Sequence, residues 1–132
     1  MSLAAYKKTI RETESPRQME RRVLAQVTAR LDAHQEDFDI ADDRGTRLTL
    51  LAEFLRPILH DNVTLWMTFQ ADLLQPQNSL PAELRASLIS LSMFIERHTA
   101  RVLAGEAKVS VLVDVNRSIL QALEGQAEAA AV

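Results

Sequence analysis

The chain has no cysteine among its 132 residues, which excludes a disulfide framework, a Cys-ligated zinc site and a thiol nucleophile. Glycine and proline are scarce, with three and four copies, and so few breaks favour a few long helices over many short strands. No uncharged run exceeds ten residues, whereas a membrane helix needs about 20 apolar residues. Lysines at positions 7 and 8 interrupt the weakly apolar start, so we expect no signal peptide and a cytoplasmic protein.

Charge of either sign is not in large excess. The chain carries 15 Lys and Arg against 18 Asp and Glu, a net charge of −3, which argues against a polybasic nucleic-acid binder. Residues 7–30 nevertheless sum to +4 and residues 31–53 to −5. These two blocks could clamp the first helix to the start of the second, or could both be solvated, since exposed ion pairs contribute little.

The apolar residues recur at helical spacing from one end of the chain to the other. Ser15 and Pro16 are typical of an N-cap and a first helical position, and the helix that follows is predicted to end before a loop at 37–44. A shorter helix is predicted before Pro16. The apolar positions of these two helices are Leu3, Tyr6 and Ile10, then Met19, Val23, Val27, Leu31 and Phe38.

A second long helix is predicted from Thr46 to Leu74, because its inward positions alternate between spacings of three and four residues. These positions are Leu48, Leu51, Leu55, Ile58, Asn62, Leu65 and Phe69. Pro57 lies within this helix and cannot donate a backbone hydrogen bond. We therefore expect a kink or a break within one turn of it.

Two more helices are predicted in the second half of the chain. Pro81 opens the third, which ends at Gly105, and the fourth is closed by Gly125. Valines at 109, 111, 113 and 115 also alternate as in a strand, but a lone strand would have no partner elsewhere in this sequence. The inward positions are Leu84, Leu88, Leu91, Ile95, His98 and Val102, then Val109, Leu112, Asn116, Ile119 and Leu123.

The predicted fold is therefore all-α: a small antiparallel bundle of four main helices plus a short N-terminal helix. We expect residues 1–125 to form a single helical domain and residues 126–132 to be a frayed C-terminal tail. No pattern indicates catalysis, because His34, His60 and His98 are isolated and no Gly-rich phosphate loop exists. We expect no catalytic residue, no metal and no cofactor, and hence a protein that is not an enzyme.

Three inward positions carry polar side chains. Asn62, His98 and Asn116 fall within about two helical turns of each other, roughly 10 Å along the axis, if neighbouring helices are antiparallel. A buried polar group without a partner costs about 1–3 kcal/mol, so each should find one. We interpret the three as a structural polar layer that fixes helix register, with a ligand site as the alternative.

The third helix is apolar on a second face, which carries Ile89 and Met93, and the second helix carries Val63 and Met67 outside its inward positions. Two interpretations remain open. Either the third helix is central and is covered by the first and last helices, or this face is an exposed groove for a partner helix.

Several segments together resemble the FlaF family of alphaproteobacterial flagellar biosynthesis regulators. They include Glu14–Arg17, Leu65-Trp66, Leu80-Pro81, the run ISLSMFIERHT at 89–99 and LVDVNRSIL at 112–120. The resemblance implies a cytoplasmic helical protein, without enzymatic activity, that associates with flagellin and promotes its synthesis and export. The family acts opposite FlbT, a regulator that restrains flagellin mRNA translation, so FlbT is a second possible partner.

A chaperone for flagellin has a plausible physical basis, because the amphipathic helical ends of flagellin lack partners before assembly. For such a chaperone we predict five apolar anchors and two charged residues at their rim. The anchors are Val63, Trp66, Met67, Ile89 and Met93, and the rim residues are Arg85 and Arg97.

The alternative function is a post-transcriptional regulator that acts directly on flagellin mRNA. Its candidate surface is the first helix, with Arg17, Arg21, Arg22 and Arg30. The net negative charge and the lack of an RNA-binding motif disfavour RNA binding. DNA binding is disfavoured more strongly, because the third helix is too apolar to lie in a groove.

Overall fold

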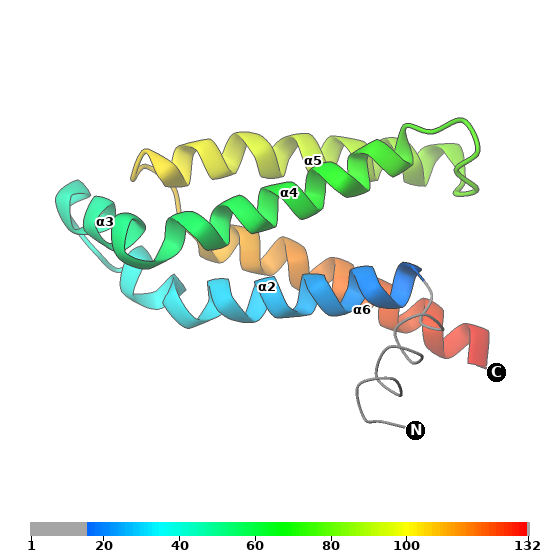
Figure 1. Cartoon of the computed structure of the whole chain (residues 1–132), viewed down its shortest axis with the longest axis horizontal. Helices are drawn as coiled ribbons and strands as arrows, with labels where there is room; N and C mark the ends of the chain where they lie inside the picture. Colours follow the sequence, from blue (N-terminus) through cyan, green and yellow to red (C-terminus); the bar gives the residue numbers. More distant parts are fainter. Residues whose placement is uncertain (1–15, 132) are drawn as a thin grey trace, which may run out of the picture.

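The computed structural model describes residues 16–131, with side chains for residues 20–124. Four helical rods follow one another in this part of the chain and form an up-and-down bundle (Figure 1). They are α2 (Pro16–Asp39), a joined rod of α3 (Arg44–Leu50), η1 (Leu51–Leu55) and α4 (Arg56–Leu73), then α5 (Ala82–Leu103) and α6 (Ser110–Ala131). The described residues contain no strand, so the all-α prediction is confirmed and the valine-rich segment belongs to the start of α6. None of the described helices is long and apolar enough to span a bilayer.

The helix ends fall close to the predicted ones, with two differences, at the 37–44 loop and at Gly125. The predicted short helix over Leu3 to Ile10 and the Ser15 cap lie outside the described residues. The loop predicted at 37–44 is shorter, because α2 continues through Phe38, which is fully buried, to Asp39. The predicted end at Gly125 is wrong: α6 continues to Ala131, since one helical glycine costs only about 1 kcal/mol and alanine-rich sequence follows it.

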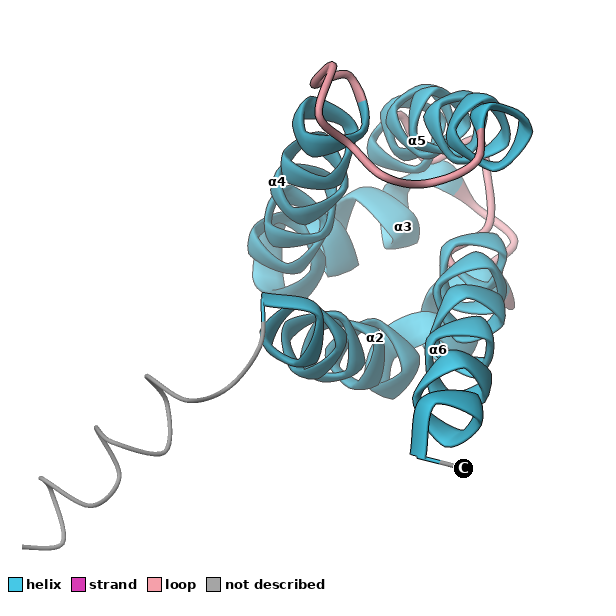
Figure 2. Ribbon diagram, turned by 90° about the vertical axis from the view of Figure 1, so that its right-hand side faces the viewer, coloured by secondary structure: helices cyan, strands magenta, loops and turns pink. Residues whose placement is uncertain are grey.

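Pro57 does not interrupt the second rod, which runs unbroken from Arg44 to Leu73. The irregularity that we expected takes the form of a wide turn just before the proline. The Arg56 N–H reaches back five residues to the Leu51 carbonyl, as in a π-helix, and Pro57 then lies in the first turn of α4. Figures 1 and 2 show α3 at an angle to α4, so this turn is where the rod changes direction.

The helices pack as two close pairs, α2 with α6 and α4 with α5, and the pairs meet mainly where α2 contacts α4. The contact between α5 and α6 is much smaller. Figure 2 views the bundle from one end and shows the 74–81 loop crossing from α4 to α5. The interpretation of the third helix as a central one is therefore wrong. Helix α5 packs chiefly on α4 and lies at a side of the bundle.

Burial is strongly graded along the bundle. In α5 the fully buried side chains begin only at Ser92, and in α6 they end at Asn116. The residues outside these limits, 82–91 and 117–124, have side chains that are half-buried or exposed. We call the end of the bundle that holds the 40–43 and 104–109 turns the closed end, and the end at the 74–81 loop the open end. The core is therefore concentrated in the middle and toward the closed end.

At the closed end, Asp39 connects the end of α2 to the start of α6. Its carboxylate accepts hydrogen bonds from the backbone N–H of Val109, at 2.7 Å, and of Ser110, at 3.0 Å. The first turn of a helix has unpaired N–H groups, which a carboxylate satisfies well. Asp39 thus caps α6 from 70 residues away in the chain.

Arg47 in α3 makes a second connection at the closed end. Its guanidinium donates to the carbonyls of Phe38 and Asp39 at the end of α2, both at 3.3 Å, and to Gly105 after α5, at 3.0 Å. Gly105 has a φ of +76°, and the N–H of Glu106 donates to the Arg101 carbonyl, as in a Schellman motif. Arg47 therefore ties the ends of two helices to a third.

Asp43 caps α3 locally. Its carboxylate accepts hydrogen bonds from the hydroxyl and the N–H of Thr46, both at 2.7 Å. These bonds favour the ionised carboxylate and hold the pKa of Asp43 below its ordinary value. Asp43, the last residue of the 40–43 loop, is thus the N-cap of the second rod, which begins at Arg44.

Replacing Asp39 by alanine is expected to lower the free energy of unfolding by about 1–2 kcal/mol, the usual cost of a lost N-cap. Urea denaturation followed by circular dichroism measures this loss. Asp42→Ala is the matched control, because Asp42 is exposed in the same loop region. If the two variants were equally stable, the long-range cap would contribute nothing.

The two charged blocks do not clamp to each other in the ion pairs described. Arg30 of the basic block pairs with Asp61 of α4, at 2.8 Å, and Asp32 of the acidic block pairs with Arg117 of α6, at 3.1 Å. All four side chains are substantially exposed, so each pair contributes little. The clamp hypothesis therefore finds no support in these pairs.

Candidate partner-binding cleft

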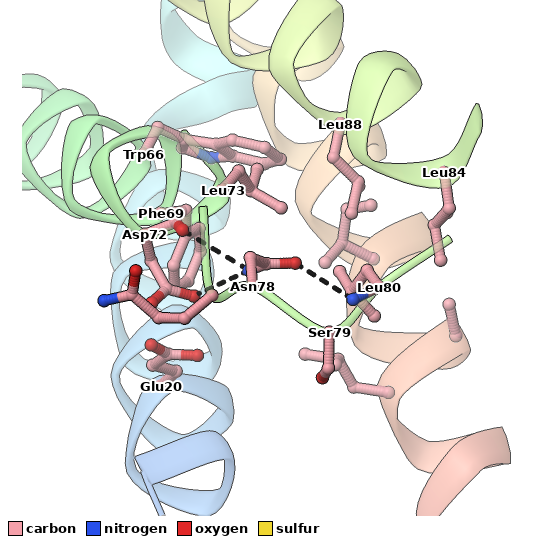
Figure 3. A pocket seen from close by; sticks show the side chains of 14 residues that line it. Glu20, Trp66, Phe69, Asp72, Leu73, Asn78, Ser79, Leu80, Leu84 and Leu88 are labelled. Carbon is pink, nitrogen blue, oxygen red and sulfur yellow. Dashed lines mark hydrogen bonds between the residues drawn. The ribbon is translucent and has the colours of Figure 1, made fainter. Parts of the chain in front are cut away.

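A cleft of about 640 Å³ lies at the open end of the bundle, where α5 and α6 diverge (Figure 3). Its walls come from the end of α4, the 74–81 loop, the start of α5 and the second half of α6, with one residue from α2. The lining residues are Glu20, Trp66, Phe69, Asp72, Leu73, Gln77, Asn78, Ser79, Leu80, Leu84, Leu88, Ile119, Ala122 and Leu123. A cavity of this size can take several apolar side chains from a partner.

The loop that covers one side of the cleft is held by two side chains. Arg85 donates to the Leu73 carbonyl, at 2.8 and 3.1 Å, and to the Gln75 carbonyl, at 3.2 Å, which satisfies the end of α4. The amide of Asn78 donates to the Asp72 carboxylate at 3.2 Å, and its oxygen accepts from the Leu80 N–H at 3.0 Å (Figure 3). These bonds place Leu80 against the cleft.

Trp66 lies between the cleft and the core. Its indole N–H donates to Oδ1 of Asn116 at 2.9 Å, and Nδ2 of Asn116 donates to Oδ1 of Asn62 at 2.8 Å. Because an indole can only donate, this chain of bonds fixes the orientation of both amides. Nδ2 of Asn62 has no hydrogen-bond partner among the described residues. The polar chain joins α4 to α6 through the core, next to the cleft.

The cleft is suited to an apolar ligand with a positively charged margin. Its lining is dominated by leucine, isoleucine and aromatic side chains, and Phe69 meets Trp66 edge to face with ring centres 5.7 Å apart. Two carboxylates, Glu20 and Asp72, belong to the lining, and no Lys or Arg does. An amphipathic helix that presents apolar residues at spacings of three and four matches such a surface.

The family described as flagellar protein FlaF matches the chain over residues 2–123. The chain belongs to the FlaF family. This match confirms the resemblance drawn from the sequence, and FlaF is a flagellar protein family rather than a family of enzymes. The search of curated proteins and the search of solved structures each gave no match.

The predicted polar layer of this FlaF chain is divided in the structure. Asn62 and Asn116 are fully buried and hydrogen-bonded to each other, as described above. His98 does not join them: its Nε2 donates to the Lys108 carbonyl at 2.8 Å, and its ring stacks on Phe94. The Lys108 carbonyl, in the turn after α5, therefore accepts the hydrogen bond of the imidazole. The third member of the buried polar layer is Trp66 in place of His98.

Two of the predicted partner-binding residues have other roles. Trp66 is only 1% exposed, so it cannot be a protruding anchor, although part of its ring lines the cleft. Arg85 is not a free rim charge, because three hydrogen bonds to backbone carbonyls occupy its guanidinium. The sequence placed both residues on the correct helices but could not show which neighbours they meet.

The other predicted partner-binding residues lie outside the cleft. Val63, Met67 and Ile89 are half-buried, whereas Met93 and Arg97 are exposed. The bond from Gln70 to Ser92, at 3.1 Å, sets α4 and α5 at the same level. The 100° step between residues places Met93 on the outer side of this pair, whereas Met67, at the edge of the same side, is half-buried and packs against the core. We call Val63, Met67, Ile89 and Met93 the outer α4–α5 face, and it remains a candidate surface.

Sequence reasoning missed most of the cleft. Leu84, Leu88, Ile119 and Leu123 were predicted as inward positions, which they are, but no helix covers them. Periodicity identifies the face that a helix turns inward, but it does not show whether the opposite helix is close enough to bury that face. The proline, asparagine and serine residues at 74–81 did indicate a loop at this end of the bundle.

The basic residues of α2 do not form one stripe. Around the helix, Arg21 lies 100° from Arg22 and 180° from Arg30, and Arg30 is paired with Asp61. Arg17 lies outside the residues whose side chains are described. No group of three His, Asp or Glu side chains in the described part of the chain could hold a metal ion.

Proposed function

We propose that this FlaF protein binds unassembled flagellin in the cytoplasm as a chaperone and thereby promotes flagellin synthesis and export. The proposal combines the flagellar family with one structural observation, the apolar cleft at the open end. The cleft exposes side chains that lie on the inward faces of α5 and α6 and would otherwise belong to a core. A protein helix that occupies it would exclude water from both partners.

Flagellin is a suitable guest on physical grounds. Its terminal helices are amphipathic, and before assembly their apolar faces lack the neighbours that later cover them. Exposed apolar helices self-associate, so a bound chaperone would keep the subunit competent for export. A contact with FlbT would be a second interaction, and nothing in the cleft distinguishes that partner from flagellin.

The test compares two leucines of α5 at opposite ends of the helix. Leu84 lines the cleft and is 39% exposed, whereas Leu103 lies at the closed end and is 40% exposed. Leu84→Asp is expected to weaken the affinity for purified cognate flagellin at least tenfold, because burying a leucine contributes about 1.5–3 kcal/mol. Leu103→Asp should leave the affinity within about twofold. Isothermal titration calorimetry measures both.

A third variant separates the two candidate surfaces. Met93→Asp alters the outer α4–α5 face, where Met93 is 46% exposed, and leaves the cleft intact. Loss of binding in Met93→Asp with full binding in Leu84→Asp would move the site to the outer face. Absence of binding by the unmodified chain would refute the function itself. Thermal melts by circular dichroism show whether each variant is folded.

A further inference from the structure

The cleft has two chemically different sides. The side formed by α5 and α6 is apolar and includes Leu84 and Leu88. The side formed by the end of α4 and the 74–81 loop carries most of the polar lining residues. Among them are Asp72 and Asn78, which Figure 3 shows across the cleft from the α5 leucines. An apolar surface accepts amphipathic helices of many kinds, so discrimination between them depends on the polar side.

Asp72 is the charged group on that polar side. It is an exposed residue in the last turn of α4, where the helix dipole disfavours an anion and favours a cation. No Lys, Arg or His in the described part of the chain forms an ion pair with it. Arg85 binds the Leu73 and Gln75 carbonyls at the same helix end. The Asp72 carboxylate is therefore available to a cation that a partner brings.

The hydrogen bond that Asp72 makes within the chain does not require its charge. Nδ2 of Asn78 donates to Oδ2 of Asp72 at 3.2 Å, and this bond helps to hold the 74–81 loop. An asparagine at position 72 would offer an amide oxygen that accepts the same bond. A purely structural role thus needs an acceptor without a charge, and Asp72→Asn separates the two.

We propose that Asp72 selects the guest of the cleft, which is an amphipathic helix whose apolar stripe is flanked by a lysine or an arginine that pairs with this carboxylate. The inference rests on the proposed function, since it takes the guest to be a protein helix. The leucines of the cleft supply most of the binding free energy by excluding water. Asp72 then disfavours helices that carry an acidic residue at the same place.

Three synthetic peptides, each held helical by a hydrocarbon staple, test this selection without flagellin. They share leucines at spacings of three and four residues and carry Lys, Gln or Glu at both ends, so that one flank reaches Asp72 whichever way the helix lies. The unmodified chain should bind the Lys peptide about three- to fivefold more tightly than the Gln peptide, as a partly exposed ion pair allows. The Glu peptide should bind most weakly. Isothermal titration calorimetry measures these affinities, and added salt should reduce the differences.

Two variants of Asp72 and one control complete the design. Asp72→Asn should bind the Lys and Gln peptides equally, to within about twofold. Asp72→Lys should reverse the order and bind the Glu peptide more tightly than the Lys peptide. Asp114→Asn is the matched control, because Asp114 is exposed on α6 outside the cleft lining and its loss changes the net charge by the same amount. It should keep the full preference, and thermal melts by circular dichroism show whether each variant is folded.

Selection by Asp72 is overturned if the three peptides bind equally, if Asp72→Asn keeps the preference, or if Asp114→Asn loses it. Absence of binding by all three peptides also overturns it, because the cleft would then not take an amphipathic helix. Failure of the flagellin function has a different signature: purified flagellin does not bind, while the peptides still show the charge preference. Flagellin binding that Leu84→Asp weakens and Asp72→Lys leaves unchanged would support the cleft and refute the selection.

Discussion

Replacing Trp66 by alanine is expected to lower the free energy of unfolding by about 4–5 kcal/mol, a large part of the stability of a domain of this size. The side chain is 1% exposed and is the largest in the core, and truncating a buried tryptophan costs about 3–5 kcal/mol through lost burial and the cavity left behind. The variant also removes the donor to Asn116 Oδ1, and an unsatisfied buried acceptor costs about 1–3 kcal/mol. Water that enters from the neighbouring cleft keeps the sum near the lower end.

Two further variants divide this effect into its parts. Trp66→Phe keeps most of the ring and removes the indole N–H, so it should cost about 1–3 kcal/mol. Phe54→Ala is the control for truncating an aromatic ring, because Phe54 is 47% exposed and its one ring contact within the described part of the chain is with His34. It should cost less than about 1 kcal/mol. Urea denaturation followed by circular dichroism is required, since Trp66 is the single tryptophan. A loss below 2 kcal/mol in Trp66→Ala would contradict the prediction and would mean that neighbouring side chains fill the cavity left by the indole.

The second large effect is expected for Arg47→Ala, at about 2–3 kcal/mol. The guanidinium joins the ends of α2 and α5 through three carbonyls, and hydrogen bonds from charged groups contribute about 1.5–3 kcal/mol each. It also lies over the ring of Phe38, 5.4 Å from the centroid, which adds about 0.5–1 kcal/mol. Water replaces part of these bonds at the partly exposed helix ends, so the total is less than their sum.

Arg56→Ala is the matched control for this variant, because Arg56 is an exposed arginine in the same rod. Its loss should change stability by less than about 0.5 kcal/mol. Arg47→Lys keeps the charge but cannot reach three carbonyls at once, and it should recover less than half of the loss. Equal stability of Arg47→Ala and Arg56→Ala would mean that the closed end does not depend on this side chain.

The helices themselves were predictable from the sequence. The spacing of Leu48 to Phe69 predicted a rod of the right length, and Pro81 and Gly105 marked the ends of α5 to within two residues. These features are local, because caps, prolines and periodicity act within a few residues along the chain. The family was also recognisable, since its motifs are short stretches of sequence.

Contacts between distant residues were not predictable in the same way. Asp39 looked like one acid in an acidic stretch, but it caps a helix 70 residues further on. His98 and Asn116 shared the same kind of position, yet only Asn116 reaches Asn62, because the turn after α5 offers the imidazole a carbonyl. Which of two equivalent polar groups finds a given partner depends on how the helices cross, and the sequence pattern does not specify this.

The graded burial along the bundle places stability and tolerance of substitution in different parts of the molecule. Most of the buried side chains of α5 and α6 lie in the middle and toward the closed end, so substitutions of exposed residues at the open end should leave the rest folded. The cleft residues Leu80, Leu84 and Leu123 can therefore change while the scaffold stays intact. In an evolving lineage this end of the molecule should tolerate the fastest divergence, and it should also be the first region whose backbone amides exchange with deuterium.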